Sequence, residues 1–431
     1  MNGSGSIVIR GGTVVLEQVL TRADVLVVDG IVTQISASRI GVPATATVLD
    51  ASGCWVGPGL VDLHTHLREP GNEAAETVET GTRAAAKGGY TAVVAMPNTT
   101  PAIDNVAVVR QVLQLGERAG LVDVHVAGAI TVGRQGTQLA PMAEMAALGV
   151  RLFTDDGTGV QDNRLMRRAL EYASRLGVTL AQHCEDASLA EGGVMHEGEW
   201  SSRLGLPGQP AEAEEVMVAR DIALCRRTGA PVHFLHMSTA GSVELIRRAK
   251  AEGLPVSAEA APHHFTLTDA ALAGYDTVFK VHPPLRSDAD VAAVKAALAD
   301  GTIDAIATDH APHTAETKER SMLEASPGML GLETAMSLAL TELGCTPQRL
   351  FTLMSSGPAR VARIADMHGT LAVGRAANVC VIDPSAVWTV DPSRLASKAR
   401  NTPYAGRLMT GRVRHTICNG STTVRNEEEQ R

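Results

Sequence analysis

Aromatic and charged side chains are scarce in this chain of 431 residues, at 3% and 20% of the total. No apolar run reaches the roughly 18 residues that a membrane-spanning helix needs. The net charge is −9 and no basic stripe is present, which argues against nucleic acid as a partner. The six cysteines form no Cys-x-x-Cys pair, and the N-terminus carries no secretion signal. We therefore expect a cytoplasmic globular protein with reduced thiols and no membrane contact.

Apolar side chains are plentiful, at 45% of the residues, which is enough for one large domain and an accessory one. Residues 6–57 contain short β-strand patterns, two of them joined by the hairpin signal Asp29-Gly30. Similar strand patterns return near the C-terminus, at 379–383 and 411–420. Each set is too small to hold a core alone. We predict that residues 1–57 and 366–431 combine into one β-sandwich domain.

The middle of the chain, residues 58–365, alternates strand patterns with helical ones, as parallel α/β folds do. Eight strands are predicted, at 57–64, 91–97, 122–129, 150–155, 178–184, 231–237, 255–261 and 303–308. Helices are predicted between them, at 73–88, 104–119, 162–176, 211–229 and 241–252. An open doubly wound sheet would have the same strand count. We predict a (β/α)8 TIM barrel because polar residues cluster directly after the strands, where such barrels carry their active sites.

Two histidines, His64 and His66, stand at the end of the first predicted barrel strand. Residues i and i+2 of a strand point to the same face, so both imidazoles can offer a nitrogen to one metal ion. A lone histidine at a strand end is more often structural. Here, however, six of the eight strands end in His or Asp, and a closed barrel would bring these ends together. The pattern therefore predicts a metal site.

Four histidines and two carboxylates suit one or two Zn²⁺ ions, which accept nitrogen and oxygen ligands. One ion would be held by His64, His66 and Asp309, the other by His183 and His236. An acid of the Asp155-Asp156 pair would bridge them. A metal-activated water needs a base that accepts its proton and returns it to a leaving nitrogen, and Asp309 is placed for this work. The residues by themselves predict metal-assisted hydrolysis of an unspecified substrate.

Seven motifs are distributed along the chain: Asp-Leu-His-Thr-His-Leu-Arg-Glu-Pro-Gly (62–71), Met-Pro-Asn-Thr (96–99), Phe-Thr-Asp-Asp-Gly (153–157), His-Cys-Glu-Asp (183–186), Pro-Pro-Leu-Arg (283–286), Ala-Thr-Asp-His-Ala-Pro-His (307–313) and Pro-Gly-Met-Leu-Gly-Leu-Glu-Thr (327–334). Together they resemble class I dihydroorotases of the amidohydrolase superfamily, although His-x-His alone marks the whole superfamily. The resemblance implies reversible, zinc-dependent cyclisation of N-carbamoyl-L-aspartate to L-dihydroorotate in pyrimidine (UMP) biosynthesis. It also implies the barrel-plus-sandwich architecture.

The resemblance also assigns roles by position. It makes His64 and His66 ligands of one zinc and His183 and His236 ligands of the other, with Asp156 as the acid that matches a ligand and Asp309 as ligand and general acid/base. The residues it implies for substrate binding are Arg68, Asn98, His313, Pro327 and Gly328. The planar guanidinium of Arg68 suits a substrate carboxylate. His282 stands where the family usually has Asn, and we expect it to contact the substrate ring.

Several alternatives remain. Hydantoinases and allantoinases share the fold, but they usually bridge their metals with a carboxylated lysine, and residues 150–156 contain no lysine. Allantoinases also tend to carry Asn at the position of Arg68. A non-catalytic scaffold subunit of aspartate transcarbamoylase would lose ligands, whereas all six are kept here. A homodimer and a catalytic complex with aspartate transcarbamoylase are both compatible with the sequence. The polar loop 314–326 fits a mobile lid or a solvated connector equally well.

Overall fold

The fold was analysed in a computed structural model that describes residues 5–17 and 19–430. Its larger part is a sheet of eight strands in the order β15-β14-β13-β10-β9-β8-β7-β6, and all the pairings within it are parallel. The strands are β6 (Leu60–Thr65), β7 (Tyr90–Ala95), β8 (Asp123–Gly128), β9 (Leu152–Phe153), β10 (Thr179–Gln182), β13 (Val232–Phe234), β14 (Val256–Ala260) and β15 (Ala305–Ile306). Each of the eight predicted strands is therefore present.

The two end strands, β6 and β15, close this sheet into a barrel. An isolated parallel bridge pairs Thr65 with His310, and the His66 amide donates to the His310 carbonyl oxygen over 2.9 Å. Side chains reinforce the closure, because Asp62 Oδ1 accepts from the Thr308 amide and Asp62 Oδ2 from the Thr308 hydroxyl, both at 2.7 Å. The predicted barrel is confirmed, and the open-sheet alternative is excluded. Closure also brings the ends of the first and last barrel strands together.

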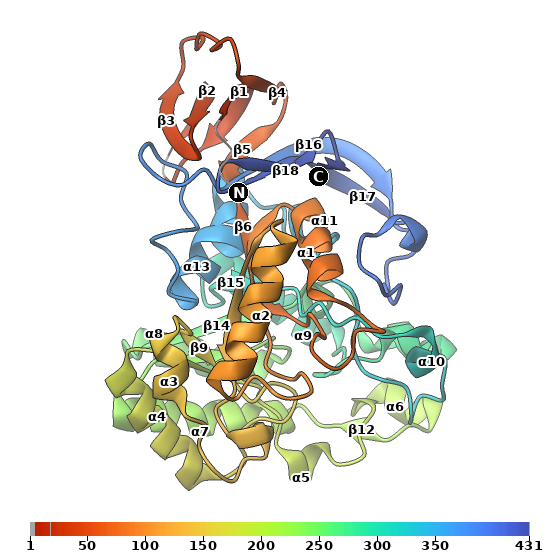
Figure 1. The fold of residues 1–431 in the computed structure, drawn as a ribbon. Helices are drawn as coiled ribbons and strands as arrows, with labels where there is room; N and C mark the ends of the chain where they lie inside the picture. The colour runs from red at the N-terminus through yellow and green to blue at the C-terminus, as the bar shows by residue number, and fades with distance from the viewer. Residues whose placement is uncertain (1–4, 18, 431) are drawn as a thin grey trace.

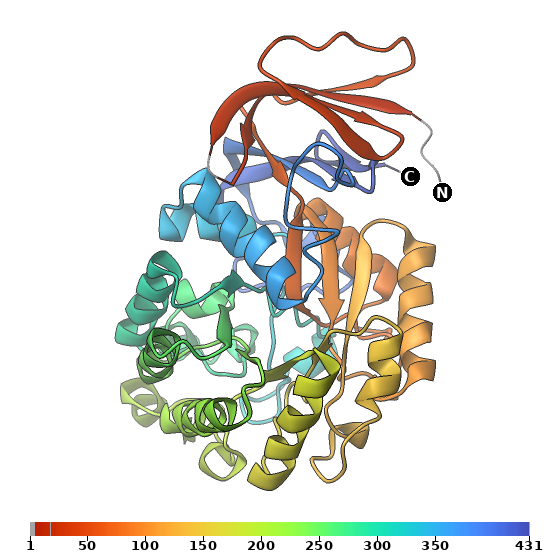
Figure 2. The same ribbon diagram turned by 90° about the vertical axis from the view of Figure 1, so that its left-hand side faces the viewer.

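Helices surround the barrel (Figures 1 and 2). The five predicted ones are α1 (Val78–Lys87), α2 (Val106–Ala119), α4 (Asn163–Leu176), α7 (Glu212–Thr228) and α8 (Ala240–Ala251). Helix α1 begins five residues later than predicted because the Thr77 side chain accepts from the Thr80 amide and caps its N-terminus. The structure adds α3 (Met142–Ala147), α9 (Asp288–Asp300), α11 (Ala335–Leu343), α12 (Pro347–Phe351) and α13 (Gly357–Val361). No described helix is long and apolar enough to cross a membrane.

Longer excursions follow the later barrel strands. Between β10 and β13 they comprise α5 (Ala187–Ala190), β11 (Met195–His196), α6 (Glu199–Leu204) and β12 (Gly208–Gln209), and after β15 they include α10 (Ala315–Lys318). Met195 and Met322 of these excursions pack in one apolar cluster with Leu272 and Leu285, which follow β14. This cluster supports the loops at the carboxyl end of the barrel, where the predicted site lies.

The accessory domain is one nine-stranded sheet in the order β19-β18-β17-β16-β5-β1-β2-β3, with β4 paired to β1. Strands from both termini meet in it (Figure 1): β1 (Ser6–Val15), β2 (Leu20–Val28), β3 (Ile31–Ser36), β4 (Thr47–Asp50), β5 (Trp55–Pro58), β16 (Val379–Thr389), β17 (Leu408–Cys418), β18 (Ser421–Arg425) and β19 (Glu428–Glu429). Ile9 and Val25 share a buried core with Val379 and Ile417. A β-domain built from both termini is thus confirmed, whereas the boundaries at 57/58 and 365/366 stay predictions.

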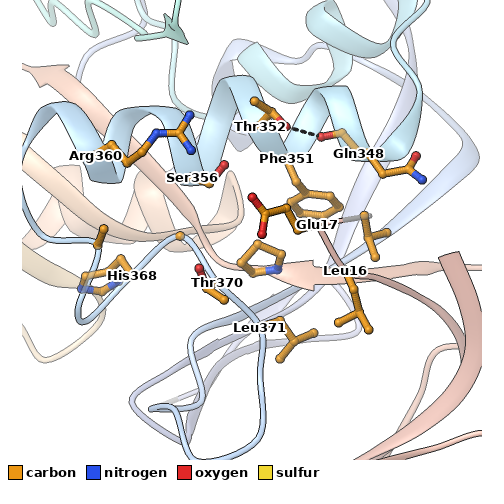
Figure 3. Close-up of a pocket in the computed structure, with 14 residues that line it drawn as sticks. Leu16, Glu17, Gln348, Phe351, Thr352, Ser356, Arg360, His368, Thr370 and Leu371 are labelled. Atoms are coloured by element: carbon orange, nitrogen blue, oxygen red, sulfur yellow. Dashed lines mark hydrogen bonds between the residues drawn. The ribbon is translucent and has the colours of Figure 1, made fainter. Parts of the chain in front are cut away.

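A cavity of about 210 Å³ lies where the accessory sheet meets the helices that follow the barrel (Figure 3). Leu16 and Leu371 line it together with Phe351, whose ring points into the space. Thr352 donates its hydroxyl to the Gln348 carbonyl oxygen at 2.8 Å on the same wall. None of the predicted site residues is among the described residues that line it. The predicted chemistry therefore does not involve this cavity.

Candidate active site

Five of the predicted metal ligands meet at the carboxyl end of the barrel and form two groups that share one carboxylate. The first group is His64, His66 and Asp156, and the second is Asp156, His183 and His236. In each group the donor atoms lie within 4.8 Å of one another, and all five residues are buried. His64 lies in β6, and the others directly follow β6, β9, β10 and β13. Barrel closure thus assembles residues that are up to 172 positions apart, from His64 to His236.

The Asp156 carboxylate lies between the two histidine pairs. Its Oδ1 is 3.3 Å from His64 Nε2, 3.5 Å from His183 Nδ1 and 3.7 Å from His236 Nε2. Its Oδ2 is 3.7 Å from His66 Nε2. Burial alone would raise the pKa of Asp156, but the adjacent His64 and the hydrogen bond with His183 hold this pKa well below its usual range. Asp156 is therefore an anion placed to serve both groups.

The neighbouring acid, Asp155, does not join the site. Its Oδ1 accepts from the amides of Ile130 and Thr131 at 2.9 and 3.0 Å, and its Oδ2 accepts from the Thr131 hydroxyl. Because these contacts hold the Asp155 side chain away from the site, only Asp156, which begins the following turn, faces the histidines. The structure thus selects Asp156, the acid that the family resemblance also selected.

Asp309 lies beside the first group. Its Oδ1 is 3.1 Å from His66 Nε2 and 3.6 Å from His64 Nε2, and its Oδ2 is 3.9 Å from His263 Nε2. Burial would raise the pKa of Asp309, but the hydrogen bond with His66 lowers it below its usual value. An ionised carboxylate in this place can accept a proton from a water molecule held by the same histidines.

The donor set fits a divalent metal. His64 Nε2 is buried and has no hydrogen-bond partner among the described residues. His183 Nδ1 and His236 Nε2 face each other at 2.9 Å, so their two nitrogens point toward one location. Imidazole nitrogens and carboxylate oxygens arranged in this way are suitable ligands for one or two ions that accept nitrogen and oxygen. The site is therefore metal-binding in character.

Arg68 reaches the site from the loop after β6. Its Nε donates to the Pro312 carbonyl oxygen at 3.1 Å, and its Nη2 lies 3.3 Å from His313 Nε2. Burial lowers the pKa of Arg68 to about 10, so the guanidinium stays charged at neutral pH. Burial and the Arg68 charge lower the pKa of His313 to about 3, which keeps that imidazole neutral. A fixed cation and a neutral hydrogen-bonding ring thus lie together, as recognition of an anionic substrate requires.

The predicted Pro327-Gly328 segment packs against the same histidine. The Pro327 carbonyl oxygen is 2.8 Å from His313 Nε2. Gly328 has a φ of +136°, and a Cβ there would lie 2.7 Å from Ala311 Cβ and 2.9 Å from His313 Nε2. Only glycine therefore fits this position without moving the histidine.

Two buried lysines hold the loop that precedes this segment. Lys318 Nζ donates to the carbonyl oxygens of Ser326 at 2.9 Å and Gly328 at 3.1 Å. Lys280 Nζ donates to the Met322 carbonyl oxygen at 2.7 Å. The loop 314–326, for which the sequence allowed a lid or a solvated connector, is thus fastened to the site in this structure.

Asn98 and His282 occupy different sides of the site. The Asn98 amide orients two metal-group residues: its Oδ1 accepts from His66 Nδ1 at 2.8 Å, and its Nδ2 donates to Asp156 Oδ2 at 3.0 Å. His282 lies beside Glu185, with His282 Nδ1 3.9 Å from a carboxylate oxygen that is also 3.9 Å from His183 Nε2. The His282 side chain is 31% exposed, which places it at the His183 side of the site entrance.

Sequence reasoning missed a carboxylate that contacts the metal group from behind. Glu259 on β14 is fully buried, and its Oε1 is 2.9 Å from His64 Nδ1. Burial would raise the pKa of Glu259, but hydrogen bonds from His233 and His64 lower it to about 2. The available signal was one charged residue in the stretch 255–261, which is otherwise apolar except for Ser257.

Comparisons with known proteins agree with this geometry. A family model described as dihydro-orotase-like matches residues 53–242. The dihydroorotase of Pelotomaculum thermopropionicum is 54% identical over 424 residues, which cover 97% of this chain and 98% of that relative. The dihydroorotase of Mycobacterium tuberculosis is 50% identical over 410 residues, with 94% and 95% covered. The structure of an L-hydantoinase (dihydropyrimidinase) from Arthrobacter aurescens superposes with a TM-score of 0.88 at 26% identity, covering 99% of this chain and 97% of that one. The chain therefore belongs to the dihydroorotase family of metal-dependent cyclic amidohydrolases.

Proposed function

We propose that this enzyme interconverts N-carbamoyl-L-aspartate and L-dihydroorotate, a step of pyrimidine biosynthesis, at the carboxyl end of its barrel. The observation that carries the proposal is the Asp156 carboxylate shared by two histidine pairs, with the half-buried Arg68 cation nearby. Both forms of the substrate carry a carboxylate, which a guanidinium binds through two parallel hydrogen bonds. The histidine groups supply the metal site, and Arg68 supplies the anchor for the substrate.

The metal we propose is Zn²⁺, with one or two ions per subunit. The proposed ligands are His64, His66, Asp156, His183, His236 and Asp309, a mixture of nitrogen and oxygen donors that zinc accepts. When bound, the metal supplies a Lewis acid that polarises a carbonyl and makes water more acidic. Asn98 supports the donor set because it contacts both His66 and Asp156.

Asp309 is the proposed proton carrier. In ring opening, a water oxygen attacks the amide carbonyl carbon, and the Asp309 carboxylate takes the proton that this water loses. The ring C–N bond then breaks, and Asp309 delivers the same proton to the leaving nitrogen. Cyclisation follows these steps in reverse. Asp309 is 3.1 Å from His66 Nε2 and is held ionised by its histidine neighbours, which suits it to the first transfer.

Substrate binding is assigned to the residues around these groups. Arg68 and His313 would hold the carboxylate, and Pro327-Gly328 would border the ring beside His313. The second amide hydrogen of Asn98 is proposed to reach the substrate, since the first is used by Asp156. His282, at the His183 side, is proposed to contact the ring from there.

Two rival functions are less well supported. A hydantoinase or allantoinase activity would fit the fold of the Arthrobacter protein, but the place between the metal groups is taken by Asp156, and residues 150–156 contain no lysine. A scaffold role without catalysis would not require six buried ligand residues in one site. The identity of 54% to a dihydroorotase also exceeds the 26% to the hydantoinase.

We also propose a cellular setting and an assembly for the enzyme. All six cysteines carry free thiols and five are buried, as expected for a protein of the reducing cytoplasm. A homodimer and an association with aspartate transcarbamoylase are the two assemblies that we propose to test, since the sequence is compatible with both. Analytical ultracentrifugation of the enzyme alone, and then with added aspartate transcarbamoylase, tests both.

The deciding experiment measures ring opening of L-dihydroorotate by the zinc-loaded enzyme, with hydantoin and allantoin as competing substrates. We expect turnover of dihydroorotate alone, and loss of this turnover in Asp309→Asn. Turnover of hydantoin or allantoin instead would retain the metal chemistry and reject the substrate. No turnover of any of the three, even with aspartate transcarbamoylase added, would favour the scaffold role.

A further inference from the structure

A chain of hydrogen bonds extends through the barrel core behind His64. His64 Nδ1 is 2.9 Å from Glu259 Oε1, and Glu259 Oε2 is 3.0 Å from His233 Nε2. His233 Nδ1 is in turn 2.9 Å from Ser257 Oγ. The side chains of His64, Glu259 and His233 are all 0% exposed. The chain therefore links a proposed metal ligand to three residues of the barrel interior.

The strand period explains why these residues meet. Val256, Ala258 and Ala260 of β14 pack in the large apolar core with the surrounding helices. The alternate residues, Ser257 and Glu259, consequently point to the inside of the barrel. His233 lies on the neighbouring strand β13, in parallel register with Ser257.

The hydrogen bonds with Glu259 fix the position of the imidazole proton on both His64 and His233. An ionised carboxylate only accepts hydrogen bonds, so the two imidazole nitrogens that face Glu259 must both donate to it. His64 therefore carries its proton on Nδ1, which leaves the Nε2 lone pair directed at the metal group. His233 carries its proton on Nε2, and its Nδ1 accepts from the Ser257 hydroxyl. In this arrangement, each polar side-chain atom of His64, Glu259, His233 and Ser257 has a hydrogen-bond partner except His64 Nε2.

A carboxylate in the core is costly unless nearby groups compensate its charge. The partners that contact Glu259 are two imidazoles rather than a lysine or an arginine. A cation on the far side of His64 would provide the missing compensation. A carboxylate behind a metal-binding histidine also orients the ring and increases its basicity.

We propose that Glu259, itself held by His233 and Ser257, is a positioning residue that sets the tautomer and orientation in which His64 binds the metal. This inference rests on the proposed function, because it takes His64 as a ligand. It assigns a role to three residues that neither the motifs nor the substrate chemistry had indicated.

The test is the Zn²⁺ affinity of the metal-free, full-length protein, measured by competition with a chromophoric chelator. Glu259→Gln keeps the size of the side chain. Its amide NH₂ group, however, faces one of two imidazole N–H groups, so that two donors meet without an acceptor. We expect Zn²⁺ to bind about 10- to 100-fold more weakly, the usual effect of losing such a partner. Glu259→Asp, which retains the charge but shortens the reach, should weaken binding less, and it is the second variant if Glu259→Gln does not fold.

Two further variants make the outcome specific. Asp123→Asn alters a pairing of a carboxylate with a buried histidine outside the site, in which Asp123 Oδ2 is 3.0 Å from His368 Nε2, and it should leave Zn²⁺ affinity unchanged. His64→Ala removes the ligand itself, and wild-type affinity in this variant would reject the proposed metal site. If His64→Ala loses Zn²⁺ affinity while the Glu259 variants lose only thermal stability, the positioning role is overturned. Glu259 would then contribute only to the stability of the barrel.

Discussion

Replacing Asp156 by asparagine should affect both metal groups at once. Asp156 Oδ1 lies 3.3–3.7 Å from His64, His183 and His236, and its Oδ2 lies 3.7 Å from His66. The substitution keeps the shape of the side chain and removes its charge. Loss of one partner from a buried ionic pair costs about 3–5 kcal/mol. Since 1.4 kcal/mol corresponds to a factor of ten, each ion should bind about 100-fold to several thousand-fold more weakly.

The assay is the metal content per protein chain, determined by mass spectrometry after dialysis against buffered free Zn²⁺. His183→Ala removes a donor from the second group only and should spare the ion of the first group. Asp155→Asn is the matched control, because that acid bonds the Ile130 and Thr131 amides and should leave metal content unchanged. Asp156→Asn should lose more metal than His183→Ala. Equal losses in these two variants would refute the shared role of Asp156.

Four other changes have defined outcomes. Arg68→Met should raise KM for dihydroorotate about 100-fold with little change in kcat, because charged hydrogen bonds contribute about 1.5–3 kcal/mol each to binding. Steady-state kinetics measure both constants, and an unchanged KM would reject Arg68 as the anchor of the substrate carboxylate. Asp309→Asn should lower kcat about 100- to 10,000-fold while calorimetry still detects substrate binding, and a rate near that of the wild type would remove Asp309 from proton transfer. Asp62→Ala should lower the free energy of unfolding, measured in urea, by about 3 kcal/mol, because it leaves the Thr308 amide and hydroxyl without their acceptor. A decrease well below about 1 kcal/mol would show that barrel closure does not depend on this contact. Burial and the Lys280 charge lower the pKa of Lys318 from 10.5 to about 7. Between these pH values the unfolded chain holds a proton that the folded chain has lost, so the free energy of unfolding should rise by up to about 1.4 kcal/mol per pH unit. Lys318→Met should lack this rise, and an identical pH dependence in both proteins would contradict the assignment.

Local patterns were sufficient for the architecture. The alternation of apolar strands and helices predicted all eight barrel strands, because burial on both faces leaves a continuous apolar run in the sequence. The Asp29-Gly30 hairpin signal also holds, since both residues adopt the positive φ values that such a turn requires, 49° and 80°. Boundaries were less accurate where one side chain decides them, as the Thr77 cap does at the start of α1.

The candidate site was predictable to the extent that ligands stand at strand ends. His64, His66, His183 and His236 follow this rule, and closing the barrel is enough to bring them together. The strand period also places Arg68 on the side of His64 and His66, but the substrate-binding roles of Arg68, His313 and Gly328 were implied only by the family motifs. Their contacts depend on loops whose conformation is set by packing, such as the two buried lysines that fasten residues 314–326.

The sequence by itself determined that strand ends rich in histidine and aspartate would surround one site, because a two-residue period and a closed parallel sheet allow little else. Only the tertiary structure decided which of two adjacent acids faces that site and which groups stand behind it. Asp155 bonds backbone amides, Asp156 contacts four histidines, and Glu259 holds His64 from a strand 195 residues away. Such choices depend on the direction of each side chain and on long-range contacts, which no local pattern encodes.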